Sequence, residues 1–203
     1  TTHPINFRNM PVGSTNTIIY LMYKENNVKI TKEMAGMMLS GILSDTLILN
    51  SPTTTLIDKD AVNNLARIAE VDYKKYGFDM ISYGTRMEGK TKEEVLYTDF
   101  KKYPTDEGTI GLGQVLTTDI SEYDNEKDEY IEMLNNIAKS GDYKFLGLFV
   151  TDIIKGGTYV YYNDGGKEIL ENAFNTEISQ GKYLPGVLSR KLQILPAILE
   201  IMN

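Results

Sequence analysis

The sequence contains no cysteine, which excludes disulfide bonds, thiolate metal sites and thiol nucleophiles. It has one histidine, His3, and no apolar run near the roughly 20 residues that a membrane-spanning helix needs. No basic segment leads into an apolar stretch, as it would in a secretory signal peptide. From these absences we expect a cytoplasmic protein that does not cross a membrane.

Positive charge is also in short supply. The 203 residues include 21 Lys and Arg against 28 Asp and Glu, which gives a net charge of −7. An acidic chain of this kind is a poor general binder of nucleic acid. Any anion that it binds must be held by a local cluster of cations or by metal ions. The hydrophobic fraction of 41% is enough for one large domain or two small ones.

One amphipathic stretch, residues 31–50, carries a carboxylate at a conspicuous position. At helical periodicity Met38, Gly41 and Ile42 share an apolar face with Ile48, and Asp45 falls in the middle of that face. A carboxylate buried without a partner would cost several kcal/mol or become protonated. Two interpretations remain open from the helix alone: Asp45 binds a metal ion, or it is a buried carboxylate that caps a neighbouring loop.

The first 84 residues are predicted to be mainly helical. The alternating segment INFRNM indicates a short strand, and Ser14 and Thr31 are good N-cap residues for the helices that follow them. The expected elements are a strand at 5–10 and helices at 15–25, 31–50, 60–70 and 74–86. Amphipathic helices with a single strand need a further surface to pack on.

A polar, glycine-containing stretch at residues 84–90 predicts a domain boundary. Beyond it we expect a mixed sheet flanked by helices. The expected strands are 109–120, 144–152, 158–162 and 183–188, with helices at 91–100, 124–139, 166–174 and 192–202 and a turn at 104–108.

The segment 181–198 contains no acidic residue, although the protein is acidic overall. It carries Arg190 and Lys191 between a predicted strand and a predicted helix. Pro196 is tolerated only in the first turn of that helix, so the helix N-terminus lies close to both cations. Two cations and free backbone N–H groups at one point would suit a phosphate. The alternative is a surface loop with two solvated cations.

These segments together resemble the family II (manganese-dependent) inorganic pyrophosphatases of the DHH phosphoesterase class. The matching stretches occur in order along nearly the whole chain: PVGSTNTI (11–18), YKENNVKI (23–30), GILSDTLILNSPTTT (41–55), LTTDI (116–120), LFVTDII (148–154) and GVLSRKLQ (186–193). The Ser-Asp pair of the central helix and the C-terminal Ser-Arg-Lys are specific as a combination.

The resemblance implies a role for four residues. Asp45 would be a metal ligand, and Arg190 and Lys191 would bind pyrophosphate. Lys101 would also contact the substrate, with Lys102 as the fallback. The family has a second lysine after Arg-Lys, where this sequence has Leu192.

The resemblance further implies an α/β fold in two parts. Residues 1–84 would be a mostly helical remnant of a parallel-sheet DHH metal-binding domain. Residues 85–90 would be a linker, and 91–203 a mixed-sheet, DHH-associated substrate-binding domain. The early His-x-x-x-Asp-x-Asp, the bridging Asp and the Asp-His-His of the family are absent from this sequence. We therefore expect the back part of a longer enzyme, inactive by itself.

The activity so implied is hydrolysis of pyrophosphate to two phosphates at a dinuclear centre of Mn²⁺ (or Co²⁺) with Mg²⁺. The resemblance also implies a homodimer, formed through the DHH domain of the full-length enzyme. Two alternatives stay open: an exopolyphosphatase of the same class, and a non-catalytic phosphate-binding or assembly module. Neither nucleic acid nor a membrane is an expected partner.

Overall fold

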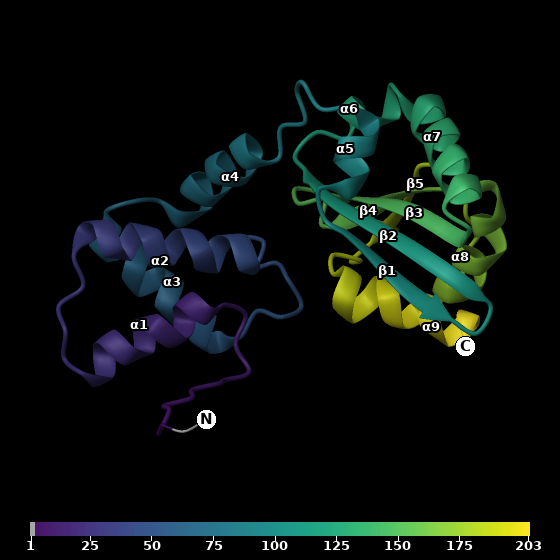
Figure 1. The fold of residues 1–203 in the computed structure, drawn as a ribbon. Coiled ribbons are helices and arrows are strands. Elements are labelled where there is room, and N and C mark those ends of the chain that lie inside the picture. Colours follow the sequence, from purple (N-terminus) through teal and green to yellow (C-terminus); the bar gives the residue numbers. More distant parts are fainter. Residues whose placement is uncertain (1–2) are drawn as a thin grey trace. The chain divides into compact units, whose positions relative to one another are not determined.

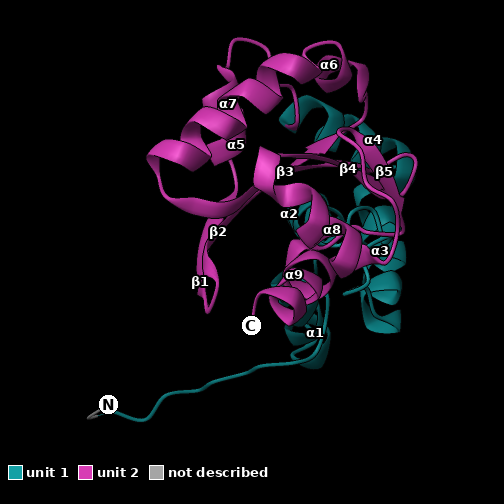
Figure 2. Cartoon of the chain, turned by 90° about the vertical axis from the view of Figure 1, so that its right-hand side faces the viewer, with its two compact units in different colours: residues 1–84 teal, residues 85–203 magenta. Residues whose placement is uncertain are grey.

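The structure is a computed structural model that describes residues 3–203. The chain forms two compact units, residues 1–84 and residues 85–203. Figure 1 shows the order of the elements, and Figure 2 distinguishes the two units by colour. Within the described part of the chain, no helix is both long enough and apolar enough to span a membrane.

The described residues of the first unit form four helices: α1 (Thr15–Glu25), α2 (Lys32–Asp45), α3 (Leu56–Ala69) and α4 (Tyr73–Gly84). Ser14 and Thr31 cap α1 and α2 with their side chains, as the sequence predicts. Thr55 forms a capping box with Asp58 at the start of α3. The core of this unit lies between the helices and is centred on one face of α2, whose buried residues are Ala35, Met38, Leu39, Ile42 and Leu43.

Helix α2 ends earlier than the predicted residue 50. After the C-cap Thr46, the backbone of Leu47, Ile48 and Leu49 takes φ values of 49°, 55° and 67°. A left-handed conformation costs about 1–2 kcal/mol per residue for side chains of this kind. Hydrogen bonds hold the turn: the N–H of Ile48 donates to the carbonyl of Leu43 at 2.8 Å, and that of Leu49 to the Thr46 hydroxyl at 3.2 Å.

A fully buried carboxylate, Asp58, fixes the loop before α1 to the start of α3. It accepts hydrogen bonds from the N–H of Gly13 (2.9 Å), from the Thr17 hydroxyl (2.5 Å), and from both the N–H and the hydroxyl of Thr55. Burial acts to raise the pKa of Asp58, but these hydrogen bonds from Thr17, Thr55 and Gly13 outweigh it and lower the pKa below its usual value. The carboxylate is therefore charged and satisfied inside the unit.

The predicted strand at residues 5–10 is wrong. These residues form no strand in the structure and are almost all exposed. Alternation alone does not make a strand, because its backbone groups need a neighbouring strand, and the described residues of this unit provide none. The segment is instead tied by an ion pair between Arg8 and Glu25 at the end of α1.

The second unit contains a five-stranded sheet in the order β1-β2-β3-β4-β5. The strands are β1 (Phe100–Thr105), β2 (Gly108–Thr117), β3 (Tyr143–Asp152), β4 (Gly157–Tyr162) and β5 (Lys182–Pro185). Strands β2 and β3 are parallel, and the other neighbours are antiparallel. The predicted mixed sheet, and with it the α/β class, is confirmed.

Helices cover both faces of this sheet, as Figure 2 shows. On one side lie α5 (Lys92–Tyr97), α6 (Ser121–Asp124) and α7 (Lys127–Ser140). On the other side lie α8 (Lys167–Phe174), a π-helical turn (Arg190–Ile194) and α9 (Leu195–Met202), with a short 3₁₀ turn (Asp164–Gly166) before α8. Each face has its own apolar core, because successive strand residues point to opposite sides.

Strand β1 was not expected from the sequence, which predicts a helix at 91–100 and a turn at 104–108. Helix α5 ends at Tyr97, and the chain then pairs with β2 from Phe100 onward. Pro104 and the two lysines obscure the strand pattern. They are tolerated because β1 is an edge of the sheet, where proline needs no ladder partner and lysine discourages pairing with other chains.

We predict that Asp58→Asn destabilises the first unit by about 2 kcal/mol or more, because the amide nitrogen cannot accept the hydrogen bonds made to one carboxylate oxygen. Urea unfolding followed by circular dichroism at 222 nm measures the change.

In the native chain, the stabilisation that the Asp58 carboxylate gives the first unit should also decrease as the pH drops below about 4. A carboxyl group whose pKa is lower in the folded protein than in the unfolded chain stabilises the fold at pH values above the unfolded pKa. This stabilisation is lost as the group becomes protonated.

The matched control is Asp60→Asn on the same helix, where the carboxylate is exposed and only 3.9 Å from Lys24. Its effect on stability should stay below about 0.5 kcal/mol. Equal losses for the two variants would contradict the role given to Asp58.

Candidate functional site

Arg190 begins the π-helical turn that leads into α9. Ser189 precedes it and caps the turn, since its hydroxyl accepts a hydrogen bond from the N–H of Leu192 at 3.2 Å. Pro196 lies in the first turn of α9, as its missing N–H requires. The predicted closeness of the helix start to Arg190 and Lys191 is therefore observed.

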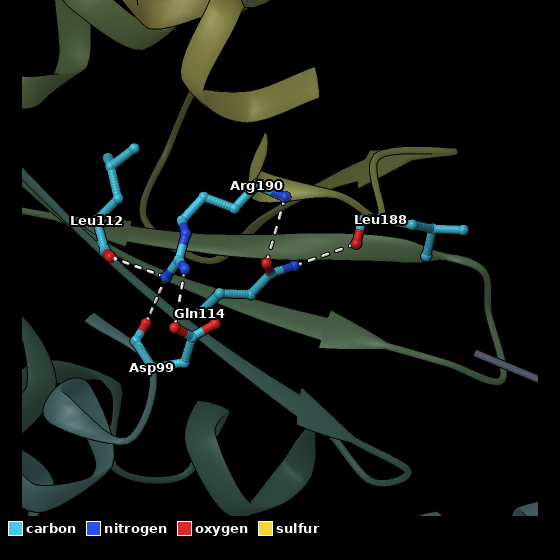
Figure 3. A network of polar contacts seen from close by, with 5 residues as sticks. All are labelled: Asp99, Leu112, Gln114, Leu188 and Arg190. Atoms are coloured by element: carbon cyan, nitrogen blue, oxygen red, sulfur yellow. Dashed lines mark hydrogen bonds and ion pairs between the residues drawn. The ribbon is translucent and has the colours of Figure 1, made fainter. Parts of the chain in front are cut away.

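The Arg190 side chain lies against the first two strands rather than in solvent (Figure 3). Nη1 donates to the backbone carbonyl oxygens of Asp99 (2.5 Å) and Leu112 (3.3 Å). Nη2 donates to Oδ1 of Asp99 at 2.8 Å. Only 12% of the Arg190 side chain is exposed, against 53% for Asp99. The guanidinium is thus fixed in one orientation, beside the end of α5 and the start of β1.

Two glutamine side chains fix the backbone around Arg190. Gln114 of β2 accepts a hydrogen bond from the Arg190 N–H (3.2 Å) and donates to the carbonyl of Leu188 (3.2 Å), as Figure 3 shows. Gln193 accepts from the N–H groups of Leu188 and Ser189. The loop is therefore held to the sheet at several points before any ligand binds.

These bonds correct one expectation. The sequence suggests free backbone N–H groups beside Arg190, but the N–H groups of residues 188, 189, 190 and 192 all donate within the protein. An anion here would be bound by side-chain cations, because the polypeptide itself already uses these backbone donors.

The pairing of β1 with β2 separates the two candidate lysines. Lys101 lies opposite Leu112, which belongs to the core on the α9 side of the sheet. Lys102 lies on the other face, where its ammonium sits 4.9 Å from the centre of the Tyr143 ring. Lys101 and not Lys102 therefore shares a face of the sheet with Arg190.

Lys191 follows Arg190 in the same turn and is exposed. Within residues 3–203 its ammonium makes no hydrogen bond or ion pair, and the same holds for Lys101. The structure thus brings Lys101 to the side of the sheet on which the turn with Arg190 and Lys191 lies. Leu112 connects them, since it pairs with Lys101 and accepts a hydrogen bond from Arg190.

Asp45, the fourth candidate, is in the other unit, at the last residue of α2. Its Oδ2 accepts a hydrogen bond from the Ser14 hydroxyl at 2.7 Å. The start of α1 can approach this end of α2 because Gly41 has no side chain: a Cβ there would lie 2.1 Å from the Asn16 amide nitrogen. The segments PVGSTNTI and GILSDT, which are far apart in sequence, therefore meet at Asp45.

Asp45 is exposed, so the expectation of a carboxylate on a buried face is wrong. The helix ends at this residue, and the left-handed turn that follows carries Ile48 and Leu49 away from the helical positions assumed for them. One carboxylate oxygen is held by Ser14, and the other makes no hydrogen bond within the described residues. A hard divalent cation would find one oxygen ligand here.

Asp45 does not belong to a complete set of metal ligands within residues 3–203. Among residues 3–203 no group of three or more histidine, cysteine, aspartate or glutamate side chains is placed to hold a metal ion.

Comparison with known proteins places this architecture in a class. Residues 78–201 match the DHHA2 domain. The structure of a Methanococcus jannaschii protein assigned to the family II inorganic pyrophosphatases superposes with a TM-score of 0.80 and 33% identity. The match covers all of this chain and 69% of that one. The chain therefore belongs to the family II inorganic pyrophosphatases, and most of its match to the DHHA2 domain lies in the second unit.

The names of curated relatives agree with this family assignment. A probable manganese-dependent inorganic pyrophosphatase from Clostridium acetobutylicum is 40% identical over 199 residues, which are 98% of this chain and 64% of the relative. One from Lactobacillus acidophilus is 37% identical over 206 residues, covering 100% of this chain and 66% of the relative. The chain thus spans slightly less than two thirds of these relatives' length.

Sequence reasoning missed Asp99, Gln114 and the second role of Ser14. Ser14 is recognisable as a helix cap, but its contact with Asp45 joins residues 31 positions apart. Asp99 is 91 positions from Arg190. A single sequence contains no local pattern that reports such pairings.

We predict that Gln114→Met weakens binding of inorganic phosphate several-fold and destabilises the second unit by about 1–3 kcal/mol, because the Arg190 N–H and the Leu188 carbonyl lose their partner. Isothermal titration calorimetry and urea unfolding measure the two effects.

Gln180→Met is the matched control. Gln180 also makes two hydrogen bonds to backbone, both to Tyr162 of β4, away from the cations. It should lower stability while leaving phosphate affinity unchanged. If both variants bind phosphate like the native chain, Gln114 does not organise the site.

Proposed function

We propose that this chain binds inorganic pyrophosphate through Lys101, Arg190 and Lys191 and is part of a pyrophosphate-hydrolysing enzyme. The observation that carries the proposal is that Lys101 and the turn with Arg190 and Lys191 lie on one side of the sheet in a protein with a net charge of −7. Membership of the family and the names of the relatives support the choice of substrate.

Each cation has a distinct part in this proposal. Arg190 is fixed and nearly buried, so it defines where the anion lies. Lys101 and Lys191 are exposed, and their ammonium groups would contact the phosphate oxygens beside it. Charge-assisted contacts of this kind contribute about 1.5–3 kcal/mol each, so the loss of one should weaken binding roughly tenfold to a hundredfold.

Asp45 is proposed as a ligand for Mn²⁺, with Co²⁺ as a substitute and Mg²⁺ as a companion ion. Its exposed carboxylate, held through one oxygen by Ser14, supports this assignment. Divalent ions would supply an activated water and neutralise phosphate oxygens when bound. The remaining ligands would have to come from outside residues 3–203.

The division of the chain supports a proposed domain assignment. Residues 1–84 would be the C-terminal part of a DHH metal-binding domain, residues 85–90 a linker, and residues 91–203 the substrate-binding domain. The first unit exposes several large apolar side chains, namely Ile5, Phe7, Val28, Met37 and Leu56. They would pack on the rest of a DHH domain, through which the full-length enzyme would form a homodimer in the cytoplasm.

We predict that Lys101→Ala weakens binding of pyrophosphate to this chain about tenfold, because it removes one of the three cations on the site's face. Lys102→Ala is the matched control. It removes an equal charge from the next residue on the opposite face and should change affinity by less than threefold. Calorimetric titration at low and at moderate salt measures both. A larger loss of affinity for Lys102→Ala would show that Lys101 is on the wrong face to be the substrate lysine.

We further predict that the 203-residue chain, supplied with Mn²⁺ and pyrophosphate, releases phosphate at a negligible rate. A single carboxylate such as Asp45 cannot hold two metal ions. A colorimetric phosphate assay tests this. A turnover within tenfold of the roughly 10 s⁻¹ of an ordinary enzyme would refute the proposed incomplete metal site.

A further inference from the structure

The hydrogen bonds of Arg190 leave one edge of its guanidinium free. The group has five N–H donors. Both hydrogens of Nη1 are used by the carbonyl oxygens of Asp99 and Leu112, and one hydrogen of Nη2 is used by the Asp99 carboxylate. Within the described residues, Nε–H and the second hydrogen of Nη2 donate no hydrogen bond.

These two remaining donors have a defined geometry. In a planar guanidinium, Nε–H and the outer hydrogen of Nη2 point the same way along one edge, whereas Nη1 and Nη2 together form the end of the group. Asp99 occupies the end. The side edge is a parallel pair of donors that matches two oxygens of one phosphate group.

We propose that Asp99 is a positioning residue: it holds the end of Arg190 so that the side edge is presented to a phosphoryl group of the bound anion. The inference rests on the proposed function, and it adds which donors of Arg190 bind the anion and which residue fixes them. Asp99 itself does not touch the ligand.

The backbone of Asp99 is suited to this task. Its carbonyl oxygen accepts a hydrogen bond from the backbone N–H of Gln114 at 3.0 Å as well as from Arg190. Asp99 is thereby fixed to β2 directly before β1 begins. A guanidinium attached to both the backbone and the carboxylate of one fixed residue loses little further freedom when an anion binds, which favours affinity.

If Asp99 opposed anion binding, its substitution would have the opposite effect on affinity. If Asp99 merely neutralised Arg190 and had to be displaced by the anion, removing its carboxylate would tighten binding. If it positions Arg190, removing it weakens binding even though a negative charge has been taken from the neighbourhood of an anion. The sign of the effect therefore distinguishes the two roles.

The test uses the 203-residue chain and inorganic pyrophosphate as the probe. Asp99→Ala should weaken binding about 5- to 20-fold. Asp99→Asn should stay within threefold of the native affinity, because its amide oxygen still accepts from Nη2. Asp106→Asn, an exposed change of the same type at the turn between β1 and β2, serves as the control for charge and should also bind like the native chain.

A second measurement reports the geometry directly. The chain has only four arginines, so the Nε–H signal of Arg190 can be assigned in a proton–nitrogen NMR spectrum by its loss in Arg190→Lys. Pyrophosphate should shift this signal in the native chain and in Asp99→Asn, but not in Asp99→Ala. If Asp99→Ala fails to fold, the native spectrum still tests which donors of Arg190 meet the anion.

The outcomes separate this inference from the proposed function. Two results overturn the positioning role of Asp99 without contradicting the proposed binding of pyrophosphate. One is tighter binding by Asp99→Ala, and the other is saturation of the native chain without a shift of the Arg190 Nε–H signal. Native-like binding by both Asp99 variants, together with a loss in Arg190→Lys, also overturns this role. If the native chain does not bind pyrophosphate, or if Arg190→Lys binds it unchanged, the proposed function fails.

Discussion

The arrangement of the candidate site depends on one nearly buried guanidinium. Arg190 is the point at which the loop before α9, the start of β1 and the middle of β2 are joined, through Asp99, Leu112 and Gln114. A cation removed from water is stable only when its donors are satisfied, and here backbone carbonyls and one carboxylate satisfy three of five. The cost of burial thus fixes the orientation of the remaining donors, and Lys101 lies on the same side of the sheet.

The first unit uses a buried anion in a corresponding way. Asp58 collects hydrogen bonds from Gly13, Thr17 and Thr55 and so fixes the loop that carries Ser14. Ser14 in turn holds Asp45, whose other oxygen stays available. In the first unit a buried charge thus orients a group at the surface, whereas in the second unit the exposed Asp99 carboxylate holds the nearly buried Arg190.

Local patterns predict much of this fold. The caps Ser14 and Thr31, the apolar periodicity of α2 and the alternation in β2 identify their elements without further information. Strand β1 escapes such reasoning because an edge strand with lysines and Pro104 owes its existence to pairing with β2. The exposure of Asp45 escapes it because the left-handed turn at Leu47–Leu49 depends on hydrogen bonds to residues earlier in the chain. The contact of Arg190 with Asp99 spans 91 positions, a separation at which one sequence gives no signal.

The most direct test of the account is an NMR titration of the 203-residue chain with inorganic pyrophosphate, followed through the backbone amides. If Arg190, Lys191 and Lys101 form one oxyanion site, the shifts will concentrate in residues 99–101, 112–114 and 188–193 and will saturate together with a single affinity. Shifts scattered over the surface lysines, or centred on Lys102 and Tyr143 on the opposite face, would contradict it.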